Sequence, residues 1–292
     1  MTEARLLSGG FQNSGGSSLV LTGRRALVLL ALALAVGLSA ELTHTHGTAA
    51  GRARLNANLR PVGSAATTAT ARPGARRLRH RVRLGQSVLR RPIVAYELGD
   101  PHERHTALIV GCIHGNEPAG VAVVRRVAGA TPIRGVDLWL IPTINPDGQA
   151  AGTRQNAHGV DLNRNFPWHW RPLGPRGAQQ YAGPRALSEP ESRIAHSLIA
   201  RLRPAVTIWF HQPLGVVDES GGSLAVERRF ARLAQLPLRR LPRYPGSAAS
   251  WQNHRIPGST AFVVELPPGM PSRAQIARWS AAVRGVAAGK TG

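Results

Sequence analysis

The residues best suited to chemistry are a histidine and a carboxylate three positions apart, His114 and Glu117, in the segment His-Gly-Asn-Glu-Pro. They follow the apolar run 106–112, which is typical of a strand buried on both faces. Pro118 disfavours helical backbone at Glu117, so we expect the pair on a turn at the carboxyl end of a strand, where open α/β sheets bind ligands. A catalytic zinc site needs three protein ligands, often two histidines and one glutamate. A surface turn with a capping glutamate is the simpler alternative for this pair alone.

Two distant residues strengthen the metal hypothesis. His211 follows the apolar run 205–210 and is placed as a third ligand, although an isolated histidine there is more often a core residue. Glu265 lies near the end of the apolar run 261–266, where a carboxylate is costly unless it is paired or lies near a metal. A single glutamate beside a metal site is what a hydrolase needs to take a proton from water and return it.

The most specific segment is 154–167, which combines arginines, asparagines and an aspartate without helical or strand periodicity. A planar guanidinium binds a carboxylate bidentately, and a second arginine can stabilise developing negative charge. The alternative is a polar surface loop that makes capping contacts. The density of anion-binding side chains favours a site.

Composition excludes several classes of protein. Lys and Arg total 37 against 15 Asp and Glu, a formal net charge of +22, and Lys290 is the single lysine. With so few acids, most of the arginines must face water, an anionic surface or anionic substrates. The one cysteine, Cys112, excludes an intrachain disulfide and a Cys-rich zinc site. Nucleic-acid binding is disfavoured because the basic residues are scattered, the aromatics are few and no recognised motif appears.

The chain divides into three parts. Residues 1–40 join a polar stretch ending in Arg24-Arg25 to a short apolar run, which predicts a signal peptide or an N-terminal membrane anchor. Residues 41–80 are rich in Ala, Thr and Arg and predict a disordered linker. Residues 81–292 remain as the catalytic domain. We therefore expect an extracytoplasmic protein, secreted or membrane-anchored, whose N-terminus inserts in or is exported across a membrane.

Alternating strands and helices predict an α/β domain with a sheet covered on both faces. A β-hairpin is expected over 82–99 with its turn at Gly85-Gln86, and Ser188 is expected to cap a helix. The expected strands are 106–112, 136–143, 205–210 and 261–266, and the expected helices are 118–130, 188–202, 223–235 and 272–288.

Taken together, these motifs resemble the M14-type zinc metallocarboxypeptidases. The resemblance covers roughly residues 85–290 and rests on His114 with Glu117, Gly-Val-Asp-Leu-Asn-Arg-Asn-Phe-Pro (159–167), Ser-Glu-Pro-Glu (188–191), His211 and Glu265, in that order. It is closest to the compact bacterial branch that includes murein peptide amidases, which trim peptidoglycan peptides. The resemblance implies a single domain with a central mixed, mostly parallel sheet covered by helices on both faces.

The resemblance also implies roles for individual residues. His114, Glu117 and His211 would bind one Zn²⁺ per chain, and Glu265 would act as general base and then as general acid. Arg154 would polarise the scissile carbonyl, and Asn163 and Arg164 would grip the terminal carboxylate of the substrate. Tyr244 would match the family's mobile tyrosine. Asp161 would orient a ligand or an arginine.

A further expectation concerns the pocket for the terminal side chain. In the resembled family the loop before the catalytic glutamate's strand lines that pocket, and here this loop is 244–260. It contains no Asp or Glu, so a lysine- or arginine-specific pocket would lack its counter-charge. Arg255 in this loop could instead pair with a second carboxylate, as in diaminopimelate or glutamate. The alternative is that Arg255 points to solvent.

These expectations predict a zinc-dependent metallocarboxypeptidase or peptide amidase that hydrolyses a C-terminal amide bond, with peptidoglycan-derived peptides as the favoured substrate. Two alternatives stay open at this point. One is a zinc deacylase of N-acyl amino acids, like aspartoacylase or succinylglutamate desuccinylase. The other is a non-catalytic wall- or polyanion-binding module.

Overall fold

The computed structural model describes residues 78–99, 102–103 and 105–289, which belong to one compact unit. The predicted signal or anchor, and the predicted linker up to residue 77, lie outside these residues. Residues 78–80, predicted as the end of the linker, are strand instead, because Leu78 already pairs with Gly99 across the first hairpin. Among the helices of the described residues, none has the length and apolarity needed to cross a membrane.

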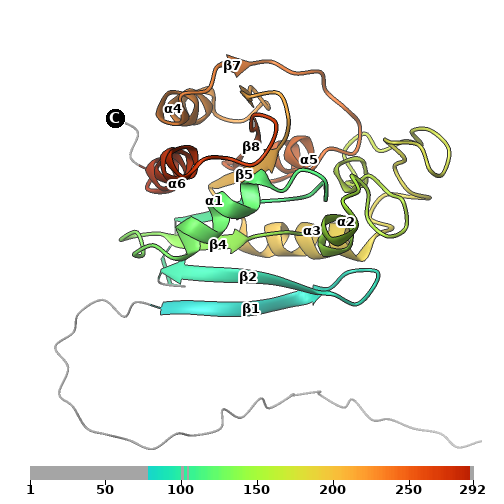
Figure 1. Ribbon diagram of the computed structural model, residues 1–292, viewed down its shortest axis with the longest axis horizontal. Helices are drawn as coiled ribbons and strands as arrows, with labels where there is room; N and C mark the ends of the chain where they lie inside the picture. The colour runs from blue at the N-terminus through green and yellow to red at the C-terminus, as the bar shows by residue number, and fades with distance from the viewer. Residues whose placement is uncertain (1–77, 100–101, 104, 290–292) are drawn as a thin grey trace, which may run out of the picture. The chain divides into compact units, whose positions relative to one another are not determined.

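A mixed eight-stranded sheet forms the centre of the fold (Figure 1). Its spatial order is β1-β2-β4-β3-β5-β8-β6-β7. The four central strands β4, β3, β5 and β8 are parallel to one another. The pairs β1–β2, β2–β4 and β6–β8 are antiparallel. The strands are Leu78–Gln86 (β1), Pro92–Gly99 (β2), Thr106–Val110 (β3), Asp137–Ile141 (β4), Val206–His211 (β5), Val216–Asp218 (β6), Leu238–Arg239 (β7) and Thr260–Glu265 (β8). The predicted mixed α/β architecture is confirmed.

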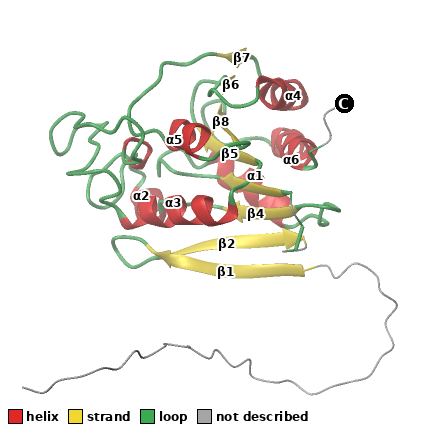
Figure 2. Cartoon of the chain, turned by 180° about the vertical axis from the view of Figure 1, so that it is seen from behind, coloured by secondary structure: helices red, strands yellow, loops and turns green. Residues whose placement is uncertain are grey.

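Apolar cores lie on both faces of the sheet. In β3, Ala107 and Ile109 pack into one core, whereas Leu108 and Val110 pack into the other. This is why the central strands are continuous apolar runs in sequence. The first core is covered by α1 (Ala119–Ala128), α4 (Leu224–Ala234) and α6 (Arg273–Ala287), and the second by α3 (Pro190–Leu202) and α5 (Ala248–Arg255). Figure 2 views the molecule from the face of the sheet that α3 and α5 cover.

Two local predictions need correction. The hairpin turn lies at 87–91 and not at Gly85-Gln86, because β1 continues to Gln86, which pairs with Pro92. The N-cap of α3 is Glu189 and not Ser188. Pro190 occupies the first turn of α3, and the Ser188 hydroxyl donates to the Glu189 carboxylate at 2.7 Å instead of to a helix N–H.

Helix α5 was not predicted, since 244–260 reads as a loop. Ser247 caps the helix by accepting a hydrogen bond from the Ser250 N–H at 3.4 Å. The buried face consists of small residues around Trp251, including Ala248 and Ala249. Such a face lacks the large apolar residues at helical spacing that identify a helix in sequence. The other unpredicted elements are α2 (Pro146–Ala151), the 3-10 turn Leu162–Arg164, β6 and β7.

Candidate active site

Three adjacent strands bring the predicted catalytic residues together. β3, β5 and β8 lie side by side and run parallel, so their carboxyl ends meet at one edge of the sheet. His211 is the last residue of β5 and is paired in register with Glu265, the last residue of β8. His114 and Glu117 lie in the turn between β3 and α1. Sheet topology thus explains how residues far apart in sequence reach one point.

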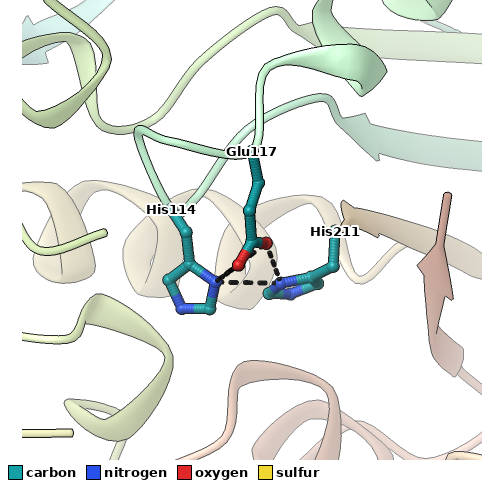
Figure 3. Close-up of side chains that lie close together, drawn as sticks. All are labelled: His114, Glu117 and His211. Carbon is teal, nitrogen blue, oxygen red and sulfur yellow. Dashed lines mark hydrogen bonds and ion pairs between the residues drawn. The ribbon is translucent and has the colours of Figure 1, made fainter. Parts of the chain in front are cut away.

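His114, Glu117 and His211 form a buried group, called here the metal cluster (Figure 3). The Nδ1 atoms of the two histidines lie 3.0 Å apart, and Glu117 Oε2 lies 2.9 Å from His211 Nδ1. Both carboxylate oxygens of Glu117 lie 3.0 Å from His114 Nδ1. Two imidazole nitrogens and a carboxylate that converge in this way match the donor set of catalytic Zn²⁺.

Asp161 orients the metal cluster from behind. This fully buried carboxylate accepts a hydrogen bond from His114 Nε2 at 2.9 Å, which leaves His114 Nδ1 directed at the cluster. Arg154 bridges Asp161 and Glu117, donating to each at 2.9–3.0 Å. Burial would raise the pKa of the Asp161 carboxyl, but His114 and Arg154 outweigh it and hold that pKa well below its usual range. The expected role of Asp161 as an orienting residue fits this geometry.

The turn that carries His114 is fixed by close backbone packing. Gly115 lies against the backbone of Gly148 in α2, where an added Cβ would be 1.9 Å from a carbonyl carbon. No larger residue fits at that position. Behind the turn, Cys112 donates from its thiol to the His114 carbonyl at 3.0 Å. Burial raises the pKa of the Cys112 thiol to about 12, which makes it a poor nucleophile at neutral pH.

Glu265 lines the same cavity as the metal cluster, which has a volume of about 300 Å³. Its Oε2 atom is buried and has no hydrogen-bond partner among the described residues. Burial raises the pKa of the Glu265 carboxyl, against the opposing effect of His211. A carboxylate beside a metal-binding cluster, with one oxygen unpaired, is suited to accept and release a proton.

The cavity continues to a group of residues called here the substrate side: Asn163, Arg164, Arg243 and Tyr244. The guanidinium of Arg164 lies 4.2 Å over the ring of Tyr244 and donates from Nη1 to the Asn163 carbonyl at 2.8 Å. Its Nε is buried without a hydrogen-bond partner among the described residues. An arginine with unused donors that faces a cavity is suited to bind a carboxylate.

Glycine 246 sets the position of Tyr244. Gly246 has φ +72° and packs so closely on the Arg164 carbonyl that a Cβ would lie 2.0 Å from it. Its N–H and carbonyl pair with the carbonyl of Trp168 and the N–H of Phe166 at 2.8 and 3.0 Å. The segment before α5 is therefore held against the segment that carries Arg164.

Arg255 is not part of the site, contrary to the expectation. It is the last residue of α5, it is exposed, and it is not among the residues that line the cavity. The helical turn explains this, since α5 directs Ala249 and Ser250 to the cavity while Arg255 lies at its far end. In the sequence 244–260 reads as a loop, in which nothing separates residues that face the cavity from Arg255.

Two site residues were missed in the sequence, Asp218 and Arg243. Both line the cavity and form an ion pair with each other at 2.8 Å. Asp218 ends the short strand β6, whose apolar residues are too few to stand out. Arg243 stands among other arginines before α5, with nothing in the sequence to mark it.

Comparison with known proteins agrees with this geometry. The family model described as zinc carboxypeptidase matches residues 75–215. Murein peptide amidase A of Vibrio campbellii is 33% identical over 198 residues, which cover 63% of this chain and 78% of that protein. The chain belongs to the zinc carboxypeptidase family. Zn²⁺ is therefore its metal, and the chain is a peptidase. The family match includes the metal cluster, Arg154, Asn163 and Arg164, whereas Tyr244 and Glu265 lie beyond it.

Other relatives and solved structures support the same assignment. Murein peptide amidase A of Escherichia coli K12 is 31% identical over 180 residues, covering 57% of this chain and 74% of that protein. The crystal structure of murein-tripeptide amidase MpaA from E. coli O157 superposes with a TM-score of 0.59 at 27% identity, covering 71% of this chain and 91% of that one. Carboxypeptidase A of Helicoverpa armigera superposes with a TM-score of 0.63 at 17% identity, covering 74% of this chain and 70% of that one, and shares the zinc carboxypeptidase fold.

Proposed function

We propose that this zinc carboxypeptidase family member hydrolyses the amide bond before the C-terminal residue of peptidoglycan-derived peptides. The observation that carries the proposal is that the metal cluster and the unpaired donors of Arg164 line one cavity, with Glu265 beside them. A peptide that places its terminal carboxylate on Arg164 would bring a backbone amide towards the metal cluster.

His114, Glu117 and His211 would hold the Zn²⁺, as their donor types and convergence fit it. When bound, Zn²⁺ supplies a Lewis acid that polarises a carbonyl oxygen and makes water more acidic. Asp161 keeps His114 in the tautomer with a free Nδ1 lone pair. Arg154 holds Glu117 and Asp161 in place together.

Glu265 moves the proton. Its carboxylate takes a proton from the attacking water as the new carbon–oxygen bond forms, and returns it to the amide nitrogen as the carbon–nitrogen bond breaks. Because its Oε2 has no partner among the described residues, no hydrogen bond to the protein has to be broken for that oxygen to act. The products are a shortened peptide and a free amino acid.

The remaining residues bind the substrate and stabilise charge. Each terminal nitrogen of Arg154 carries two N–H groups, so Arg154 can keep its two carboxylate partners and still donate to the developing oxyanion. Arg164 and Asn163 bind the terminal carboxylate, and Tyr244 packs beside it on the Arg164 guanidinium. The Asn163 side-chain oxygen accepts from the Ala248 N–H at 2.9 Å, which leaves its NH₂ group to donate.

The choice of peptidoglycan peptides rests on the relatives named murein peptide amidase A. The match to one of them extends over 78% of that protein's length. The test is to incubate the zinc-loaded chain with peptidoglycan tripeptide, with unrelated peptides and with N-acyl amino acids, and to identify products by mass spectrometry. We expect release of the C-terminal amino acid from the tripeptide. Turnover of the N-acyl amino acids alone would replace this proposal with the deacylase.

We also propose that the N-terminal segment exports or anchors the protein, so that it acts outside the cytoplasm. The support is the sequence itself, in which Arg24-Arg25 precede the apolar run 26–40. Fractionation of cells that express the full chain, with and without residues 1–40, tests this. We expect the full chain outside the cytoplasm or in the membrane fraction and the truncated chain in the cytoplasm. Cytoplasmic recovery of both would overturn the proposal.

A further inference from the structure

The cavity is lined by a third arginine, which the steps above do not use. Arg243 lies between β7 and α5 and lines the same cavity as Arg164. It belongs to the substrate side and not to the metal cluster. Its surroundings indicate what it can bind.

Asp218 holds Arg243 in place. Arg243 Nη1 lies 3.0 and 2.8 Å from the two oxygens of Asp218 and 3.2 Å from the Leu241 carbonyl. The Asp218 carboxylate is buried and also accepts from the Leu241 N–H at 2.9 Å and from the Ser220 hydroxyl at 2.7 Å. Its four acceptor sites are therefore occupied, and it has no capacity left for a cationic substrate group.

The other donors of Arg243 remain available. Among the described residues, every contact of its guanidinium passes through Nη1, which leaves Nη2 and Nε without a protein partner. The side chain is 36% exposed, so it is reached by a ligand in the cavity. A guanidinium fixed at one nitrogen, with its remaining N–H groups free, is an arrangement that binds a carboxylate.

The carboxylates that line the cavity point to the same conclusion. Glu117 is engaged by the two histidines and Arg154, and Asp218 is engaged by Arg243. Glu265 is the third, and it lies beside the metal cluster at the end of β8. A lysine or arginine side chain that extends past Arg164 would find no free counter-charge. A side chain with a carboxylate would find Arg243.

We propose that Arg243 determines specificity by binding a second carboxylate, carried on the side chain of the substrate's C-terminal residue. This inference rests on the proposed function, because it assumes that Arg164 takes the main-chain carboxylate. The preferred terminal residues are then dicarboxylic amino acids, diaminopimelate among them. Asp218 is a positioning residue for Arg243. The role expected of Arg255 is thus assigned to a different arginine.

The test measures kcat/KM for peptides that differ only in the terminal residue. Three terminal residues with a side-chain carboxylate are each paired with a residue of similar shape that lacks it. The pairs are glutamate with glutamine, 2-aminopimelate with norleucine, and diaminopimelate with lysine. For the wild type, we expect kcat/KM to be about 10- to 100-fold higher for at least one dicarboxylic residue than for its match. The reason is that Arg243 then makes charge-assisted hydrogen bonds to the second carboxylate. Arg243→Gln should abolish that preference by lowering kcat/KM for the dicarboxylic residue to the level of its match.

The controls separate specificity from folding. Arg255→Gln removes an exposed arginine outside the cavity and should keep the preference of the wild type. Arg243→Lys keeps the charge without the planar fork and should retain only part of it. Tm is measured for each variant to verify that it folds.

The outcomes distinguish this inference from the proposed function. Equal kcat/KM within every matched pair for the wild type, or a preference that survives Arg243→Gln, would overturn the inference and leave the peptidase intact. Hydrolysis of no peptide in the series would overturn the proposed function and the inference with it.

Discussion

The metal cluster and the substrate side share one cavity but differ in how completely their polar groups are paired. In the metal cluster, Glu117 contacts both histidines and Arg154, and Asp161 supports the cluster from behind. On the substrate side, Arg164 Nε is buried without a partner among the described residues, and Arg243 uses one nitrogen of three. In the first region the carboxylates are fully engaged and one ring nitrogen, His211 Nε2, is buried without a partner among the described residues, whereas the second region has several arginine donors left over.

This difference shows where each function resides. Buried charges are tolerated when they are paired, so the contacts among Glu117, Arg154 and Asp161 fix the ligand geometry before any metal binds. The buried Arg164 Nε is costly to leave unpaired, and the exposed donors of Arg243 are free to exchange water for a ligand, so both favour recognition of an anion. Variants in the two regions should therefore fail in different ways.

The largest effect is expected at Glu265, which lies where the two regions meet. Glu265→Gln keeps the shape of the side chain but removes proton transfer, so kcat should fall by about 10²- to 10⁴-fold. The zinc content and KM should change little. Steady-state kinetics with metal analysis of the same sample measure this. Near-normal kcat would show that another group moves the proton.

The next effect tests whether the network of the metal cluster matters. Asp161→Asn removes the charge behind His114 without changing its size, and zinc affinity should fall by about 10- to 100-fold. Competition with a chromophoric chelator measures the affinity. Unchanged zinc affinity would show that Asp161 does not orient the ligand and would weaken the contrast between the two regions.

A variant on the substrate side should leave zinc in place. Arg164→Gln removes the cation for the terminal carboxylate, so KM should rise by about 10- to 100-fold. A C-terminally amidated peptide is the matched probe. Wild type should cleave it as poorly as Arg164→Gln cleaves the free acid, whereas equal cleavage of acid and amide by the wild type would contradict the assignment.

The smallest effect concerns a buried carboxylate behind the substrate side. Glu227 accepts from the Ser220 N–H at 3.0 Å, and burial raises its pKa from 4.5 to about 7 because backbone hydrogen bonds do not compensate. Since the folded state binds this proton more tightly, the contribution of Glu227 to stability is complete below pH 4.5 and is lost as pH rises to about 7. Denaturant unfolding across this range should therefore show a smaller fall in stability for Glu227→Gln than for the wild type. Identical pH profiles would contradict the raised pKa.

Much of the fold could be predicted because its central strands are continuous apolar runs and its larger helices have regular apolar spacing. The short elements could not. β6 and β7 are held by their neighbours in the sheet and not by their own composition. Helix α5 buries alanines beside Trp251. These side chains are too small to give the regular spacing of large apolar residues that identifies a helix in sequence.

The same physical difference divides the site. His114, Glu117 and His211 lie at or just beyond strand ends, where topology brings them together, and their spacing could be read from the sequence. Arg243 is selected from many arginines by a contact with Asp218, which only the folded chain defines. The wrong choice of Arg255 has this cause, since charge alone does not tell which arginine faces the cavity.

The most direct measurement is the zinc content of three purified proteins, by inductively coupled plasma mass spectrometry: wild type, His211→Ala and Arg164→Gln. We predict one zinc per chain in wild type and in Arg164→Gln, and almost none in His211→Ala, which keeps only two protein ligands. Full zinc occupancy in His211→Ala, or loss of zinc in a folded Arg164→Gln, would contradict the separation of metal binding from substrate binding.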